Sequence, residues 1–328
     1  MSKAEKMLLE HIRPVTEEDL KTLPQYSYSR IEQYKNCPIS FKLKYIDEKV
    51  TDDTSLALEL GSLCHYVLEM KGKMLKESCV VKYDILESIL QDGVVDANID
   101  SDKPTERFLG VKELRKKYFE EWGKTEPTSG MTYDDKIKLF WDKVVREELE
   151  DDNWSSEYFE HYFEFVFDDR VILHGFIDRV DMMDGQYRVV DYKTSKKVYD
   201  QSKLSTSLQF GIYGLAVLLE FGKLPIEYLY RFILIDESQK ALSIGWERRI
   251  VKHLSDIFNC IQMDKDNDEF KPDPSPLCHW CNYCKTNPRA TKYKHECQYY
   301  SLWTPMNKVY TVNCEWGQEK NGGRKIIF

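Results

Sequence analysis

The segment "RVVDYKTSK", residues 188–196, joins a buried strand pattern to two side chains that can do chemistry. Val189 and Val190 are typical of the middle of a strand, which then ends in Asp191 and Lys193. Because side chains alternate along a strand, Asp191 and Lys193 lie on one face. A carboxylate can bind a divalent cation, and an ammonium can stabilise the charge of a phosphodiester transition state. Taken alone, the D-x-K pattern is more often an exposed ion pair on a surface hairpin.

A second acid strengthens the chemical interpretation. Asp184 and Gly185 form the dipeptide that two-residue hairpin turns prefer. A turn at these residues places Asp178 directly opposite Asp191, with Cβ atoms about 5 Å apart. Two carboxylates at that distance repel, and a Mg²⁺ ion between them removes the conflict, with the backbone carbonyl of Tyr192 as a further ligand. We therefore predict Asp178, Asp191 and Lys193 as catalytic residues.

The elements around this hairpin are predicted from periodicity. Residues 158–180 and 187–194 alternate and read as strands, as does 226–236, whereas 58–77, 207–221 and 246–262 have helical spacing. Residues 80–150 are mostly helical by pattern, with a loop at 91–106. A helix is expected to begin at Ser27 or Ser29 and to break at Pro38.

Five segments in this order resemble the PD-(D/E)xK nuclease superfamily, in its RecB-like exonuclease branch, which includes CRISPR-associated adaptation nucleases and phage proteins. The resemblance covers most of the chain, and the five ordered motifs together make it specific. The segments are "SYSRIEQYKNCPISFKLKY" (27–45), "GSLCHYVLE" (61–69), "GFIDRVD" (175–181), "VVDYKTS" (189–195) and "LQFGIY" (208–213).

The resemblance implies a restriction-endonuclease-like α/β fold, a mixed sheet flanked by helices, and Mg²⁺- or Mn²⁺-dependent cleavage of DNA. It implies that His65 ligates the metal, as in members that act from DNA ends. It places Gln209 and Tyr213 along the DNA path, although helix packing explains both residues equally well.

Basic residues near the catalytic strand are further candidates for DNA contact. Lys196 and Lys197 follow the strand directly, and a basic run lies at 112–117. Each of these sites could equally be a solvated face.

The tail of the chain is rich in cysteine, and four of the nine cysteines lie between residues 278 and 297. Many RecB-like nucleases hold a four-iron cluster with one cysteine from the N-terminal helix and three from the tail. That resemblance implies Cys37, Cys278 and Cys281 as ligands. For the fourth, Cys297 is preferred over Cys284. A zinc site built from the four tail cysteines is the alternative, and Cys64, Cys79, Cys260 and Cys314 are expected to be plain core or surface residues.

Composition sets the outer limits. The chain has 328 residues and a net charge of −9, which argues against a broad basic coat for nucleic acid but allows a local basic channel. No apolar run approaches the roughly 20 residues of a membrane span. We expect a cytoplasmic protein, in the host cytoplasm if it is encoded by a phage, without membrane association.

Together these features predict one RecB-like nuclease domain over 1–328, with a helical insertion at about 75–155 and a cysteine-cluster tail at about 272–328. The predicted function is a metal-dependent exonuclease acting on single-stranded or linear DNA in recombination, repair or replication, with a helicase or recombination protein as an expected partner. The alternatives are a structure-specific endonuclease on the same fold and an idle DNA-binding or scaffolding module.

Overall fold

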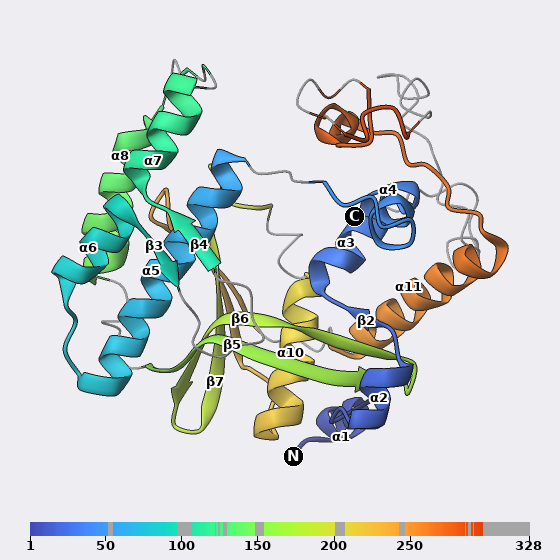
Figure 1. Ribbon diagram of the computed structural model, residues 1–328. Helices are drawn as coiled ribbons and strands as arrows, with labels where there is room; N and C mark the ends of the chain where they lie inside the picture. The colour runs from blue at the N-terminus through green and yellow to red at the C-terminus, as the bar shows by residue number, and fades with distance from the viewer. Residues whose placement is uncertain are drawn as a thin grey trace. The chain divides into compact units, whose positions relative to one another are not determined.

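The computed structural model describes residues 1–51, 55–96, 106–121, 123, 125–126, 130–147, 154–200, 207–242, 247–285, 287, 290 and 292–297 (Figure 1). The chain divides into two compact units. Unit 1 comprises Met1–Glu5, Thr54–Phe163 and Phe176–Gly245, and unit 2 comprises Lys6–Asp53, Glu164–Gly175 and Trp246–Phe328. Within the described residues, no helix is long and apolar enough to cross a membrane.

The strands form a mixed sheet. The long strands are β5 (Ser155–Phe167), β6 (Val171–Met183), β7 (Gln186–Lys193), β8 (Glu227–Phe232) and β9 (Glu237–Leu242), hydrogen-bonded in that order. β6–β7 and β8–β9 are antiparallel pairs, whereas β7 and β8 are parallel. The predicted mixed sheet flanked by helices is therefore confirmed.

The β6–β7 hairpin has the predicted turn and register. Asp184 and Gly185 both have positive φ, 50° and 69°, as a two-residue turn of this kind requires. Ladder partners run from Met183 opposite Gln186 to Arg179 opposite Val190. The next step of this register brings Asp178 to the level of Asp191.

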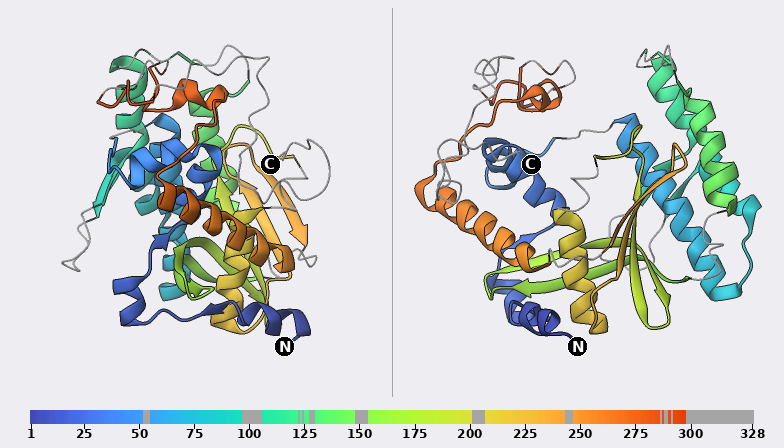
Figure 2. Two further views of the ribbon diagram at one scale, coloured as in Figure 1. Left: turned by 90° about the vertical axis from the view of Figure 1, so that its right-hand side faces the viewer. Right: turned by 180° about the vertical axis from the view of Figure 1, so that it is seen from behind.

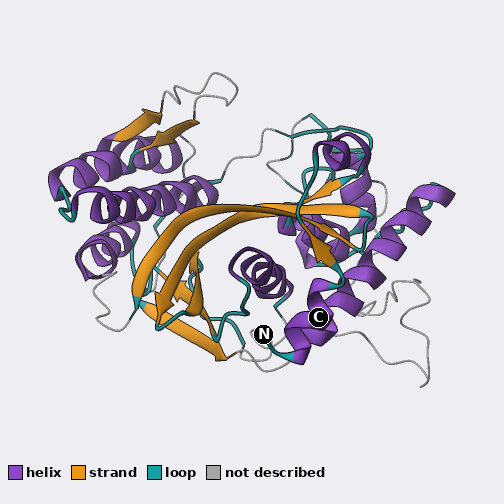
Figure 3. Cartoon of the chain, turned by 90° about the horizontal axis from the view of Figure 1, so that it is seen from below, coloured by secondary structure: helices purple, strands orange, loops and turns teal. Residues whose placement is uncertain are grey.

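Helices cover the two faces of β7 in unit 1. Val190 and Tyr192 face the core of α5 (Leu56–Ser78), while Lys193 reaches α10 (Leu208–Phe221) on the other face. Figures 1 and 2 show α5 and α10 on opposite sides of β7, and Figure 3 shows the sheet curving around α10. The end of β7 is thus enclosed from both sides.

The elements between α5 and β5 in the chain pack on α5. They are α6 (Tyr83–Asp92), β3 (Gly93–Asp96), β4 (Glu106–Leu109), α7 (Val111–Arg115), a π-helix (Lys116–Glu121), α8 (Tyr133–Leu139) and a second π-helix (Phe140–Val145). The expectation of a loop at 91–106 was wrong at its ends, because β3 and β4 pair as a short antiparallel ribbon. Apolar side chains from both α8 and the second π-helix join the core around Tyr192.

Unit 2 contains the chain's N-terminal elements and its cysteine-rich tail. Its elements are α1 (Lys3–Leu9, mostly in this unit), β1 (Ile12–Arg13), α2 (Glu17–Thr22), β2 (Gln25–Tyr26), α3 (Tyr28–Asn36), α4 (Pro38–Tyr45), α11 (Glu247–Asn267) and a short 3₁₀ helix (Pro276–Trp280). Ser27 caps α3, its Oγ accepting from the Arg30 N–H, and Cys37 separates α3 from α4. The predicted cap and the break at Pro38 are both confirmed.

Two glycines let α5 approach the strands that carry the site. A Cβ on Gly72 would lie 2.4 Å from ring atoms of Phe159 on β5. A Cβ on Gly61 would lie 3.2 Å from Oγ1 of Thr194, directly after β7. His65 lies between Gly61 and Gly72 on α5. Because the two glycines let the helix approach the strands closely, they set how far the His65 imidazole reaches toward the sheet.

Replacing Gly72 with alanine should therefore destabilise the protein. In an open helix this change stabilises by about 1 kcal/mol, but here the methyl group would overlap the Phe159 ring, and overpacking costs about 1–3 kcal/mol. Denaturant titration should show a lower free energy of unfolding, whereas Ser62→Ala on the exposed side of α5 should stay within about 0.5 kcal/mol of the parent. A stabilised Gly72→Ala variant would contradict this close contact.

Candidate metal centre

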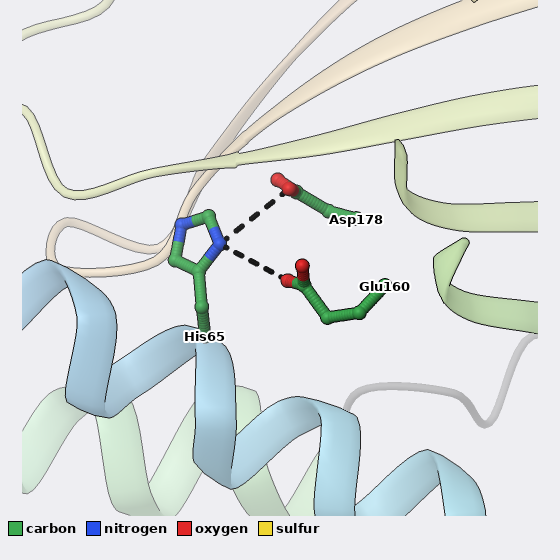
Figure 4. Close-up of side chains that lie close together, drawn as sticks. All are labelled: His65, Glu160 and Asp178. Atoms are coloured by element: carbon green, nitrogen blue, oxygen red, sulfur yellow. Dashed lines mark ion pairs between the residues drawn. The ribbon is translucent and has the colours of Figure 1, made fainter. Parts of the chain in front are cut away.

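Three potential ligands from three elements of unit 1 converge on one point (Figure 4). His65 of α5 places Nδ1 3.6 Å from Oε1 of Glu160 on β5 and 3.5 Å from Oδ1 of Asp178 on β6. The side chains of His65, Glu160 and Asp178 are 28%, 25% and 10% exposed, so the group is largely buried but still reached by solvent. Within the part of the chain that the structure describes, no other set of three His, Cys, Asp or Glu ligand atoms lies within 4.8 Å of one another.

The peptide of Tyr192 holds two of these ligands. Its N–H donates to Oδ2 of Asp178 at 2.6 Å, and its carbonyl lies 3.1 Å from Nε2 of His65. A proton on Nε2, donated to that carbonyl, leaves Nδ1 as the nitrogen that can bind a metal. The Tyr192 carbonyl, which the sequence predicts as a metal ligand, therefore accepts a hydrogen bond from His65 and lies next to the candidate metal centre.

Glu160 was not among the predicted site residues, and a local irregularity explains why. Tyr158, His161 and Phe163 all contact aromatic residues of α10, although regular alternation would place 158 and 161 on opposite faces. Glu160, between them, has a φ of 44°, as expected where a strand carries an extra residue. This bulge is consistent with the turn of the carboxylate toward His65, and alternation in the sequence gives no sign of it.

Asp191 and Lys193 form a buried pair beside this cluster. Lys193 Nζ lies 2.5 Å from Oδ2 of Asp191 and donates to Oε1 of Gln209 at 3.1 Å. The Asp191 side chain is 2% exposed, so the pair is not the solvent-exposed ion pair that the D-x-K pattern alone would suggest. The amide of Gln209 in turn donates to the Tyr213 hydroxyl at 2.9 Å.

Gln209 and Tyr213 are therefore placed where they fix Lys193. Both are buried, at 8% and 5% exposure, on α10. In this arrangement Gln209 holds the Lys193 ammonium and Tyr213 holds Gln209, and contact of either residue with DNA stays a prediction.

The electrostatics of the site are those of crowded, buried charges. Burial alone would lower the pKa of His65, but the carboxylates of Asp178 and Glu160 hold it well above its usual range. Burial raises the pKa of Asp191 to about 6, against the opposing effect of Lys193. Burial likewise raises the pKa of Glu160, with Asp178 adding to the shift.

Asp178 and Lys193 shift in the directions that their partners favour. For Asp178, burial would raise the pKa, but His65 and Lys193 outweigh it and the pKa lies below its usual value. For Lys193, burial would lower the pKa, but Asp191 and Asp178 keep it raised. The ammonium is therefore charged.

This donor set fits a divalent cation. Carboxylate oxygens suit Mg²⁺ and Mn²⁺, and an imidazole nitrogen is compatible with a transition metal such as Mn²⁺. Three carboxylates, from Glu160, Asp178 and Asp191, share the region with two cationic side chains. A divalent cation held by His65, Glu160 and Asp178 would take over the charge neutralisation that His65 otherwise supplies.

The basic candidates separate into two groups. Lys196 and Lys197 are exposed, and Lys196 is close enough to Lys136 on α8 that, after burial, it is the main influence lowering the pKa of Lys136. Most of the run at 112–117 is instead neutralised by acids, through the ion pairs Lys112–Asp92, Arg115–Asp134 and Lys117–Glu59. Positive charge thus gathers at Lys136 and Lys196, whereas much of the basic run is balanced by its neighbours.

Four cysteines meet within unit 2. Burial raises the pKa of the Cys37 thiol to about 11, and Cys297 and Cys278 add to the shift. Burial raises that of Cys281 to about 12, with Cys37, Cys297 and Cys278 as further causes. The four residues predicted by resemblance are therefore electrostatic neighbours, although no three of their sulfurs lie within 4.8 Å of one another.

Cys284 is also a neighbour of this group, since burial raises the pKa of the Cys278 thiol and Cys284 adds to the shift. Cys284 is 1% exposed, and it forms a β-bridge with Cys297 through the backbone. The tail is also tied to the segment after α4, since the Tyr283 hydroxyl donates to the Lys49 carbonyl at 2.8 Å and Lys49 pairs with Glu296 at 2.5 Å. Cys64 is buried and Cys79 exposed, as expected for plain cysteines, and Cys314 lies outside the described residues.

The amino-acid sequence was also compared with known proteins. Residues 25–286 match the PD-(D/E)XK nuclease superfamily. The chain is 28% identical over 205 residues to a subunit of the ATP-dependent helicase/deoxyribonuclease of Clostridium perfringens, an alignment that covers 58% of this chain and 17% of that protein. It is 28% identical over 215 residues to the gene 69 protein of Mycobacterium phage D29, covering 61% of this chain and 71% of the phage protein.

The gene 69 protein of Mycobacterium phage L5 is 25% identical over 305 residues, covering 82% of this chain and 97% of that protein. The family match spans most of the chain and includes His65, Glu160 and Asp178 as well as the Asp191–Lys193 pair. The chain belongs to the PD-(D/E)XK nuclease superfamily.

Mn²⁺ should stabilise the protein through the cluster of His65, Glu160 and Asp178. At a concentration about 100 times its dissociation constant, an ion bound only to the folded state adds about 2.7 kcal/mol of stability. The rise in melting temperature should be lost in His65→Ala and Glu160→Gln. Without metal, Glu160→Gln should be at least as stable as the parent, because a buried like charge has been removed.

The matched control is Glu77→Gln, near the C-terminal end of the helix that carries His65. The Glu77 side chain is exposed and lies about three turns from His65, so loss of its charge should leave the Mn²⁺ effect intact. Full retention of the Mn²⁺ effect in Glu160→Gln would exclude Glu160 as a ligand.

Proposed function

We propose that the protein is a Mg²⁺- or Mn²⁺-dependent DNA exonuclease. The observation that carries the proposal is the convergence of His65, Glu160 and Asp178 beside the buried pair of Asp191 and Lys193. Membership of a nuclease superfamily supports phosphodiester hydrolysis. The preference for DNA ends rests on His65, because the superfamily members that this chain resembles carry a histidine there when they act from ends.

Each residue of the site has a distinct task in this proposal. His65, Glu160 and Asp178 hold the cation, with Asp191 as a further carboxylate ligand or charge partner. The cation supplies positive charge to the scissile phosphate. Asp191 and Gln209 fix the Lys193 ammonium, which orients the attacking water and stabilises negative charge as the P–O bond breaks. Lys196 and Lys197 bind the DNA backbone near this point.

The wider context is also a proposal. The clostridial relatives are subunits of an ATP-dependent helicase/deoxyribonuclease, and this chain spans only 17% of their length. We infer that a helicase or recombination protein is its partner. Two mycobacteriophage proteins align over most of their own length, which supports a phage setting in recombination, repair or replication.

For the tail we propose a four-iron cluster held by Cys37, Cys278, Cys281 and Cys297. Its support is that these four thiols influence one another electrostatically. A tetrahedral zinc ion with bonds of about 2.3 Å would hold its sulfurs roughly 3.8 Å apart, whereas among the described residues no three cysteine sulfurs lie within 4.8 Å of one another. The backbone bridge between Cys284 and Cys297 gives Cys284 a packing role.

Lys193→Ala tests the catalytic assignment. Loss of a group that stabilises the transition state typically costs about 100-fold or more in rate, so cleavage of end-labelled linear DNA should fall by at least that factor while the Mn²⁺-dependent rise in melting temperature remains. Lys252→Ala, which removes an exposed cation from α11, should cleave at the parent rate. Cleavage by Lys193→Ala at the parent rate would remove Lys193 from the reaction.

A covalently closed single-stranded circle separates the two modes of cleavage in the same assay. An exonuclease leaves the circle intact and degrades the linear form. Cutting of the circle at a rate similar to that of linear DNA would establish an endonuclease instead.

Iron content tests the cluster. Protein purified without oxygen should be brown and contain about four irons per chain. Cys297→Ala should lose the iron and Cys284→Ala should keep it. Cys37→Ala should also melt at a lower temperature, because a shared cluster closes a long loop and ligation stabilises only the folded form. A colourless protein whose single zinc survives Cys37→Ala would refute the cluster without affecting the nuclease.

A further inference from the structure

Two large aromatic side chains of unit 1 are half exposed and touch one another. Tyr162 on β5 is 47% exposed, and Phe176 on β6 is 49% exposed. Their ring centroids are 5.3 Å apart and their planes are inclined at 59°. Together they present an apolar, aromatic surface to solvent, which we call the aromatic pair.

The aromatic pair adjoins the metal cluster along both strands. Tyr162 lies two residues after Glu160, and Phe176 lies two residues before Asp178. Two residues of a strand span about 7 Å. The backbone of Tyr162 therefore lies about that far from the backbone of Glu160, and the backbone of Phe176 about that far from Asp178. We propose both of these acids as metal ligands.

Each ring lies on the same side of its strand as the neighbouring carboxylate, Glu160 on β5 and Asp178 on β6. Phe163, the neighbour of Tyr162, is buried and packs edge-on against Tyr213 of α10, which puts Tyr162 on the other side of β5. On β6, Ile177 is fully buried, and alternation places Phe176 on the same side as Asp178. The aromatic pair and the Asp178 carboxylate therefore share one side of the sheet.

A cross-strand aromatic pair also stabilises strand pairing by up to about 1 kcal/mol, and such a role requires no ligand. The location favours a second role. An exposed ring beside a phosphate-binding cation is suited to the base of the same nucleotide, since bases stack on aromatic side chains without regard to sequence. A duplex offers no such face, because its bases already stack on one another.

We propose that Tyr162 and Phe176 form a stacking surface for the nucleobase next to the scissile phosphate, and that this surface makes the enzyme prefer single-stranded DNA. The proposal rests on the proposed nuclease function. It assigns the base contact to β5 and β6, whereas the cation and Lys193 contact the phosphate.

Binding to two oligonucleotides of equal length tests the proposal. One is ordinary single-stranded DNA, and the other is abasic, with the same phosphates and no bases. Affinities are measured by fluorescence anisotropy in chelator, so that no cleavage occurs. The parent should bind the ordinary strand more tightly. Tyr162→Leu and Phe176→Leu should each weaken that binding at least about fivefold, the lower end for loss of one stacked base, with little change for the abasic strand.

Two sets of variants exclude a loss of folding as the cause. Tyr162→Phe and Phe176→Tyr keep a ring and should retain the parent affinity, and melting temperatures report on all variants. Tyr187→Leu disrupts another aromatic contact of the same sheet, the stack of Tyr187 on Phe221 at 4.9 Å, and should bind both strands as the parent does.

The outcomes separate this proposal from the nuclease assignment. Equal weakening for both strands, or unchanged binding by both leucine variants, overturns the stacking surface while linear DNA is still cleaved. A parent protein that binds neither strand and cleaves no DNA overturns both. Weakening confined to the strand with bases, rescued by a ring at either position, supports the stacking surface.

Discussion

The peptide unit of Tyr192 is the connection on which the site depends. The β6–β7 ladder reaches Arg179 opposite Val190, and at the next position the Asp178 carboxylate accepts the Tyr192 N–H in place of a backbone carbonyl. The carbonyl of the same residue holds His65. One strand residue therefore fixes the Asp178 carboxylate of β6 and the His65 imidazole of α5, while its neighbours in sequence are Asp191 and Lys193.

The Tyr192 side chain is also held in place, on the face of β7 opposite to the side chains of Asp191 and Lys193. Its hydroxyl accepts from Nη1 of Arg179 at 2.9 Å, and Arg179 is paired with the fully buried Asp181. A buried charge network of this kind contributes little net stability, but removing one partner is costly. Through Arg179, the network joins the side chain of Tyr192 at the end of β7 to β6.

Much of the geometry of the β6–β7 hairpin could be predicted from the sequence, because it follows local rules of turn and strand structure. The Asp-Gly turn requires positive φ at both residues, and the turn then fixes the register that brings Asp178 level with Asp191. The position of His65 within a helix could likewise be predicted, from the helical spacing of the apolar residues around it. The paired strands β3 and β4 were missed, because a polar segment that joins two short strands has the composition of a loop.

Glu160 could not be predicted for a different reason. It occupies a strand of alternating aromatic residues, where an acid reads as a solvent-facing position, and nothing in that alternation indicates that its carboxylate lies 3.6 Å from Nδ1 of His65. The tasks of Gln209 and Tyr213 also depend on tertiary structure. Their spacing on a helix indicates a shared face, but the partner on that face, the Lys193 ammonium, is known only once β7 and α10 are packed together.

The left-handed backbone of Glu160 places function and stability in opposition. A residue with a side chain pays about 1–2 kcal/mol to adopt that conformation, and glycine does not. Selection for stability alone would therefore favour glycine at this position and would remove the carboxylate that lies 3.6 Å from Nδ1 of His65. Thermostable variants obtained by screening for folding rather than for cleavage should accumulate substitutions here, and conservation of a strained acid in a strand is a more telling mark of an active nuclease than conservation of the surrounding core.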